Sequence, residues 1–255
     1  GHLANPFETR WFAFPSMSFL AWGLSMRVFG ETVAGLRIVS ALIGTASVLA
    51  TFVLTRGLWG GRVAWLAAVF LTFGHYHLHF SRLAVNNIAD SLLIPLALTF
   101  LVLGLRSGCS VHFALTGVAV GAGWYGYFGA RLLGIIVFFY LVWRALAESR
   151  FLERHRAHLL ILLGAVVVVV VPLMLHYSAH PSTFSEGVDR VSIYTSGWLA
   201  REQASTGRTA LSLLFTQFWK SVSAFNYTLD PTFWYGADIP LLDMVSGLLF
   251  VLGLI

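Results

Sequence analysis

Charged side chains are scarce in this sequence, where Asp, Glu, Lys and Arg together make up only 11% of the 255 residues. Hydrophobic residues account for 58%, and the mean hydropathy of +0.79 lies far from the usual balance of a soluble domain. Cysteine is nearly absent, and the single Cys109 excludes an internal disulfide framework. These shortages exclude a soluble or disulfide-stapled domain and predict an integral membrane protein.

The sequence also lacks the features of complete ends. It opens on Gly1 rather than on methionine, carries no signal peptide and stops inside the apolar run 241–255. We therefore expect a fragment that is truncated at both ends.

Long apolar runs predict an all-α polytopic membrane protein. Residues 14–28 are shorter than the ~20 residues that a spanning helix needs, so they are expected to form a juxtamembrane helix. The predicted spans are residues 34–55, 63–90, 91–105, 113–130, 132–143 and 159–175. The predicted organisation is therefore a first extracytoplasmic loop ending with the juxtamembrane helix (1–33), transmembrane helices (34–178), a long extracytoplasmic loop (179–240) and the start of a further transmembrane helix (241–255).

Basic residues gather in alternate turns between these spans. The arginines in question are Arg56, Arg62, Arg106, Arg144, Arg150, Arg154 and Arg156. The positive-inside rule places such turns in the cytoplasm, so the other turns are expected to lie outside. Within the span 113–130, Gly117 and Gly121 have the small-xxx-small spacing that lets two helices approach closely.

Polar residues crowd into one stretch, HYHLHFSRLAVNNIAD, at residues 75–90. If this stretch were one helix, its side chains would recur every three or four residues along one face. The residues on that face would be His75, His79, Arg82, Asn86 and Asp90. Such a polar stripe is either the wall of an active site or a helix end that reaches water.

Arg82 and Arg131 are the basic residues of the short outer turns. An arginine at the edge of a membrane segment is unfavourable unless it is paired or beside water, and its guanidinium can grip a phosphate with two parallel hydrogen bonds. Arg82 could instead pair with Asp90, and both arginines could simply reach the headgroups. Asp90 itself is a candidate to orient a hydroxyl or bind a cation, or else a capping residue in an Asn87-x-x-Asp90 box.

The histidines invite comparison with a metal site. His75, His77 and His79 alternate, which does not place them on one helical face, and no cysteine or acid near them has ligand spacing. We expect most histidines to be interfacial and no metal site, although a divalent cation held by His176 and His180 stays open. In the loop 179–240, aromatic and acidic residues suit a sugar acceptor as well as an interfacial amphipathic segment.

Several ordered segments carry a family resemblance. They include NPFETRWFAFPSMSFLAW, GVAVGAGWYGYFGARLL, HPSTFSEGVDRVSIY and GADIPLLDMVSGLLFVLGL, together with residues 29–96. With them the chain resembles the bacterial family 39 glycosyltransferases, the protein O-mannosyltransferase-like enzymes of the GT-C superfamily that are related to aminoarabinose transferases. The resemblance implies a GT-C-type helical bundle in the inner (cytoplasmic) membrane, with its active site facing outside.

The implied reaction moves a sugar from a polyprenyl-phosphate donor to a hydroxyl of a protein, lipid or glycan; no nucleic-acid partner and no certain cofactor are implied. The family's principal catalytic acid is expected upstream of Gly1, and Glu8 does not replace it. The family's phosphate-binding residue matches Arg131, and its SR motif matches Ser81 and Arg82.

Relatives in this family place an acid at the position of Asn87, so the resemblance leaves Asp90 as a catalytic candidate displaced by three residues. Asn86 and Asn87 are candidates for binding substrate, and Arg190 is a further candidate for the donor phosphate. The rival interpretations are a transporter or lipid flippase, whose substrate path would cross the midplane, and a noncatalytic scaffold. The gathering of polar residues on one side and the lack of an inverted repeat argue against transport.

Overall fold

The computed structural model describes residue 7 and residues 15–229, 235–236 and 238–254. Every regular element in these ranges is a helix, as expected. Four of them, α2, α5, α7 and α8, are long and apolar enough to cross a membrane. The elements are η1 (Ser16–Phe19), α1 (Leu20–Phe29), α2 (Val33–Trp59), α3 (Gly61–Phe73), α4 (His75–Arg82), α5 (Asn87–Ser107), α6 (Ser110–Ala122), η2 (Gly123–Tyr125), α7 (Phe128–Ala147), α8 (Phe151–Ala179), α9 (Pro181–Val191), α10 (Trp198–Thr206), α11 (Ala210–Ser223) and α12 (Met244–Leu252).

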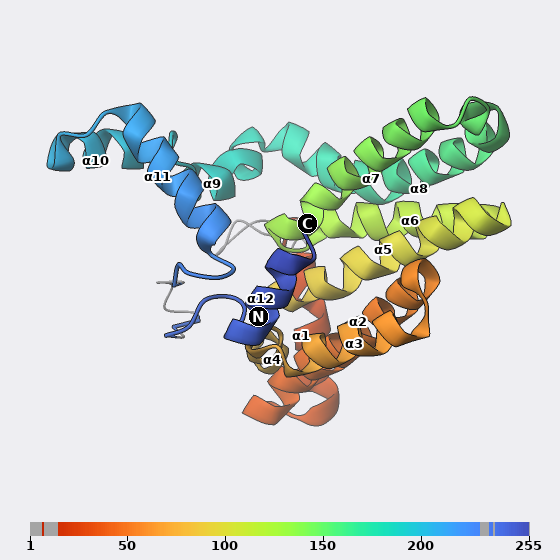
Figure 1. Cartoon of the computed structure of the whole chain (residues 1–255), viewed down its shortest axis with the longest axis horizontal. Coiled ribbons are helices and arrows are strands. Elements are labelled where there is room, and N and C mark those ends of the chain that lie inside the picture. Colours follow the sequence, from red (N-terminus) through yellow and green to blue (C-terminus); the bar gives the residue numbers. More distant parts are fainter. Residues whose placement is uncertain (1–6, 8–14, 230–234, 237, 255) are drawn as a thin grey trace.

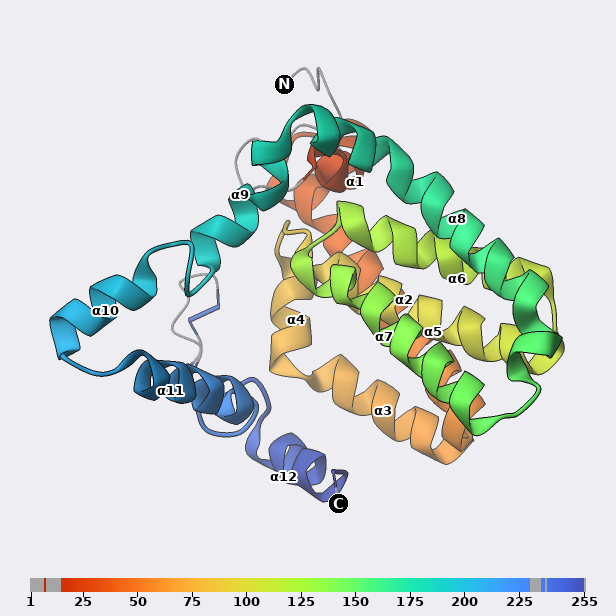
Figure 2. The same cartoon turned by 90° about the horizontal axis from the view of Figure 1, so that it is seen from above.

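The long helices form a bundle with tight turns at one end. α2 packs along α3 and α5, and α6 packs between α5 and α8. The α2–α3, α5–α6 and α7–α8 turns all lie at the same end (Figures 1 and 2). Gly60 and Gly108 adopt positive φ values of 88° and 66° in two of these turns, where other residues would be strained. All the arginines of the predicted cytoplasmic turns therefore lie at or near one end of the bundle.

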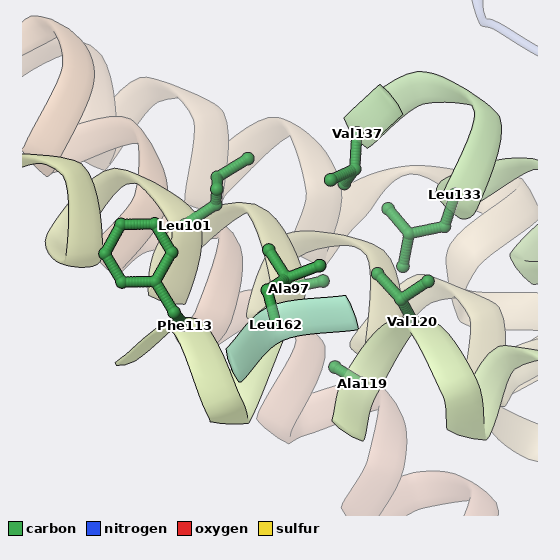
Figure 3. Close-up of a cluster of buried hydrophobic side chains, with 8 residues drawn as sticks. All are labelled: Ala97, Leu101, Phe113, Ala119, Val120, Leu133, Val137 and Leu162. Atoms are coloured by element: carbon green, nitrogen blue, oxygen red, sulfur yellow. The ribbon is translucent and has the colours of Figure 1, made fainter. Parts of the chain in front are cut away.

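A hydrophobic cluster joins α5, α6, α7 and α8. Figure 3 shows its buried members, which come from all four helices. They are Ala97, Leu101, Phe113, Ala119, Val120, Leu133, Val137 and Leu162. This cluster fixes the relative positions of the helices whose other ends form the candidate site.

Glycines let α6 approach α8 closely, which confirms the packing predicted from their spacing. A Cβ atom added at Gly117 would lie 2.3 Å from the carbonyl oxygen of Leu162, and one added at Gly121 would lie 2.7 Å from Cβ of Val169. Both distances are well inside van der Waals contact, so neither site has room for a side chain.

We expect Gly117→Ala to lower the melting temperature of the detergent-solubilised protein, because overpacking a helix interface costs about 1–3 kcal/mol. Gly164→Ala on α8 is the matched control, since a Cβ there meets nothing within 4 Å. Both variants gain the same intrinsic helix propensity. Equal melting temperatures for the two variants would contradict the close α6–α8 contact.

The expected span 63–90 is wrong, because the chain breaks at Gly74 and again after Arg82. α3 has only 13 residues, and α4 is a separate helix that turns across the end of α3 (Figure 2). Tertiary contacts with α2 explain the break. His77 Nε2 lies 3.2 Å from the carbonyl oxygen of Gly44, and a Cβ at Gly44 would overlap Ser81 Oγ. The five polar residues predicted to share one face therefore do not lie on one helix.

One other predicted boundary differs from the structure, and the predicted loop contains helices. The break expected at 129–131 occurs earlier, through η2 and the residues that follow it, so that Arg131 lies inside α7. The predicted loop 179–240 contains α9, α10 and α11. In the described part of the chain, the predicted juxtamembrane helix corresponds to η1 and α1.

Candidate functional site

Asp90 caps the start of α7. Its Oδ2 atom accepts a hydrogen bond of 2.9 Å from the backbone N–H of Ala130, one of the first-turn groups that have no partner within their own helix. Gly129 makes this approach possible, since a Cβ there would lie 2.7 Å from Oδ2. The carboxylate is buried, and its negative charge lies at the positive end of the α7 dipole.

The predicted Asn87-x-x-Asp90 capping box is wrong. The N-cap of α5 is Asn86, whose side chain makes no capping hydrogen bond. Asp90 caps a different helix instead, through Ala130, which lies 40 residues further along the chain. Spacing within α5 gives no indication of this contact, because it depends on how α5 and α7 pack.

Arg131 lies one residue beyond the capped position. Its guanidinium carbon is 4.9 Å from the ring centroid of Phe128 and 6.0 Å from that of Trp124. The charge also interacts with the Tyr177 hydroxyl on α8 and with Asp90. Within the described part of the chain, the Nε and Nη2 atoms of Arg131 are buried and have no hydrogen-bond partner.

Aromatic residues tie the start of α7 to the end of α8. The Tyr125 hydroxyl donates a 2.8 Å hydrogen bond to the carbonyl oxygen of Val169. The Phe7 ring lies 6.2 Å from Tyr125 and 6.1 Å from His176, measured between centroids. His176 Nε2 is buried and has no partner among the described residues. The candidate site is therefore the guanidinium of Arg131 beside aromatic rings. Nitrogen atoms of Arg131 and of His176 are buried there without a hydrogen-bond partner among the described residues.

The remaining predicted site residues are Arg82, Asn86, Asn87 and Arg190. Arg82 ends α4 and is exposed, and the described residues contain no ion pair between it and Asp90, so the pairing alternative is wrong. Asn86 is buried with an unpartnered Nδ2 atom, and Asn87 is half-buried. Arg190 belongs to α9, but its side chain lies outside what the structure describes.

The α4 histidines hold the segment that leads into α12. His75 Nδ1 is hydrogen-bonded to the hydroxyl of Tyr235, and the two rings stack at 5.8 Å. His79 contacts the same tyrosine edge to face, and Phe80 stacks on it at 6.4 Å. His77 instead faces α2. These three histidines pack against other parts of the protein, and the expected place of most histidines at the membrane interface stays a prediction.

Tyr235→Ala should release this segment, because deleting a buried aromatic side chain costs about 3–5 kcal/mol. We expect faster amide hydrogen exchange in α4. Tyr227→Ala is the control, since Tyr227 is 82% exposed. Unchanged exchange in Tyr235→Ala would show that α4 does not depend on this contact.

His176 and His180, the histidines considered as ligands of a divalent cation, lie against each other. The rings of His176 and His180 stack at 4.7 Å between centroids. Among the residues that the structure describes, no group of three His, Cys, Asp or Glu side chains could hold a metal ion.

Several side chains around Arg131 were not predicted from the sequence, namely Trp124, Tyr125, Phe128, His176 and Tyr177. The first three belong to the aromatic run WYGYF, which ends three residues before Arg131 and could have indicated rings around the guanidinium. Tyr177 carries no such signal, because it reaches the site only through the packing of α8.

Comparison with known proteins assigns the family. The search of curated proteins found no match, and neither did the search of solved structures. A sequence model of one family matches residues 14–175, which is more than half of the chain and includes both Asp90 and Arg131. The chain therefore belongs to the dolichyl-phosphate-mannose-protein mannosyltransferase family, and is a multi-pass membrane protein of the glycosyltransferase class.

Proposed function

We propose that this protein transfers a sugar from a polyprenyl-phosphate donor to a hydroxyl of a protein, lipid or glycan, and that Arg131 binds the donor phosphate. One observation carries the proposal: the guanidinium is fixed between aromatic rings with two buried, unpartnered nitrogen atoms. A buried donor without a partner costs about 1–3 kcal/mol, and more when it is charged, so a ligand oxygen would relieve a real penalty.

A phosphate suits these nitrogens better than a neutral ligand does. The planar guanidinium can donate two parallel hydrogen bonds to phosphate oxygens. Its charge would also stabilise the negative charge that develops on the leaving phosphate as the sugar moves to the acceptor. The rings of Phe128 and Trp124 would hold the fork in one orientation before the donor arrives.

Asp90 then acts chiefly as a positioning residue. By capping α7 at Ala130 it fixes the backbone next to Arg131, and its charge partly balances the guanidinium. A base that removes the acceptor proton must reach the acceptor, whereas Oδ2 of Asp90 is committed to the backbone N–H of Ala130. Arg82 and Arg190 remain candidates for the donor phosphate, and Asn86 and Asn87 for the substrate.

The distribution of arginines supports an outward-facing site in the inner membrane. The basic turns gather at the end of the bundle opposite the start of α7 (Figure 1). If that end is cytoplasmic, as the positive-inside rule indicates, Arg131 lies near the outer headgroups, where a lipid-linked sugar phosphate presents its charge.

The test uses purified full-length protein in nanodiscs that contain polyprenyl-phosphate sugars, with mannose and aminoarabinose donors in parallel. We expect release of free polyprenyl phosphate from one donor in the presence of an acceptor. Heat-inactivated protein is the control. Movement of intact donor across a liposome bilayer without any release would favour a flippase and contradict the proposal.

A further inference from the structure

α11 carries a stripe of large apolar side chains that contact no other part of the described chain closely enough to be buried. Its members recur at the i, i+4, i+7, i+8 and i+11 positions of one helical face, and each is more than half exposed. They are Leu211, Phe215, Phe218, Trp219 and Val222. This stripe lies outside the site around Arg131.

The helix already has a packed side, and it is not this one. Leu213 is buried on the other side of α11. The Arg208 guanidinium donates 2.8 Å hydrogen bonds to the hydroxyls of Ser212 and Thr216, which holds the polar side in place. Lys220 lies nearly opposite the stripe. The stripe is therefore an apolar face that the described part of the protein does not cover, and it is not the contact that holds α11 in place.

The end of α11 is attached to an apolar helix. The backbone N–H of Leu241 donates to the carbonyl of Ala224, and the side chain of Asn226 donates to the carbonyl of Gly247 at 2.9 Å. The rings of Phe225 and Phe250 stack at 5.1 Å. Through these contacts α11 ends beside the start of α12, a helix of nine mostly apolar residues whose large side chains are exposed.

The position of α11 in the molecule agrees with a place at the membrane surface. α10 and α11 project beyond the end of the bundle where α5 and α7 begin, away from the basic turns (Figures 1 and 2). The exposed apolar side chains of α12 are stable when lipid covers them. Because α11 ends beside α12, α11 would then lie at the level where the chain meets the bilayer.

We propose that α11 lies flat on the outer surface of the bilayer, with this stripe inserted among the lipid acyl chains. Phe218 and Trp219 are residues typical of the membrane–water interface, and a helix with one apolar and one polar face lies in that plane. Lys220 then points to water. The occupant of the stripe is lipid, because the attachment to α12 holds the stripe at the bilayer whether or not a second protein is present.

The test compares variants of the full-length protein that each carry a single spin label, either on the stripe of α11 or on its opposite face. Cys109→Ala first removes the exposed native thiol. Phe218→Cys and Leu211→Cys label the stripe near its two ends, and Lys220→Cys labels the opposite face. Each variant is measured in nanodiscs of phosphatidylcholine and phosphatidylglycerol, with oxygen as the lipid-soluble relaxant and a nickel chelate as the aqueous one.

We expect labels at positions 211 and 218 to have an oxygen-to-nickel accessibility ratio several-fold above that of the label at position 220. Ready access of the nickel chelate to all three labels would overturn the proposal. Protection of positions 211 and 218 from both relaxants would also overturn it, because it would reveal a protein partner on the stripe. Transferase activity in the labelled variants shows that each one is folded.

Discussion

Arg131→Ala in the full-length protein should lower kcat/KM for the polyprenyl-phosphate donor by roughly 100-fold or more, the loss typical of removing one preorganised donor to a developing negative charge. The loss should come from both ground-state binding and the transition state, because the leaving phosphate carries more negative charge than the bound donor. Arg131→Lys should recover part of the activity, since it restores the charge but not the fork. Release of polyprenyl phosphate is the measurement.

The control for this experiment lies at the other end of the same helix. Arg144 pairs with Glu148 at 2.9 Å and contacts the ring of Phe151. Arg144→Ala therefore removes a charge and a cation–π contact from α7 without touching the site. Similar activity losses in Arg144→Ala and Arg131→Ala would point to general damage to α7 and would contradict phosphate binding by Arg131.

Asp90→Asn and Asp90→Ala should differ strongly. Asparagine keeps an oxygen that can accept the N–H of Ala130, so we expect Asp90→Asn to retain activity within about 10-fold, well short of the loss of ~10²–10⁴-fold expected for a missing general base. Alanine leaves the start of α7 uncapped, which costs about 0.5–2 kcal/mol or more of stability. We expect this variant to lose thermal stability and most of its activity together.

The readouts for the Asp90 variants are melting temperature and kcat, measured on the same preparations. A large drop in kcat for Asp90→Asn at unchanged melting temperature would assign Asp90 a direct part in catalysis. That result would restore the catalytic role predicted from the sequence and remove the positioning role argued from the hydrogen bond to Ala130.

Apolar run lengths predicted the helical membrane class and most of the long helices, since burial of apolar surface and backbone satisfaction in lipid depend on local sequence. The spacing of Gly117 and Gly121 predicted close helix packing, because small residues four positions apart let two helices approach each other. The break at Gly74 escaped prediction, because an uninterrupted run of apolar residues precedes it. What bends the chain there is the contact of His77 and Ser81 with α2, which is 30 or more residues away.

The site was predicted only in part. Its place in a predicted outer turn and the family resemblance marked Arg131, together with Arg82, as a candidate, and the structure provides Arg131 with rings and unpartnered nitrogens. The partners of the other polar residues depend on tertiary packing. Asp90 has a cap-like spacing within α5 but caps α7, and His75 faces Tyr235, which lies 160 residues away in the chain. Such contacts leave no periodic signal in a single sequence.

Binding of polyprenyl phosphate without a sugar tests the central claim most directly, because it isolates the phosphate from the chemistry. The dissociation constant would be measured by titrating the lipid into full-length protein in nanodiscs, for the unmodified protein and for Arg131→Ala and Arg144→Ala. Hydrogen bonds to a charged group contribute about 1.5–3 kcal/mol, so Arg131→Ala should bind roughly 10- to 100-fold more weakly, while Arg144→Ala should bind normally. Equal affinity of all three proteins for polyprenyl phosphate would contradict the assignment of Arg131 as the donor-phosphate site.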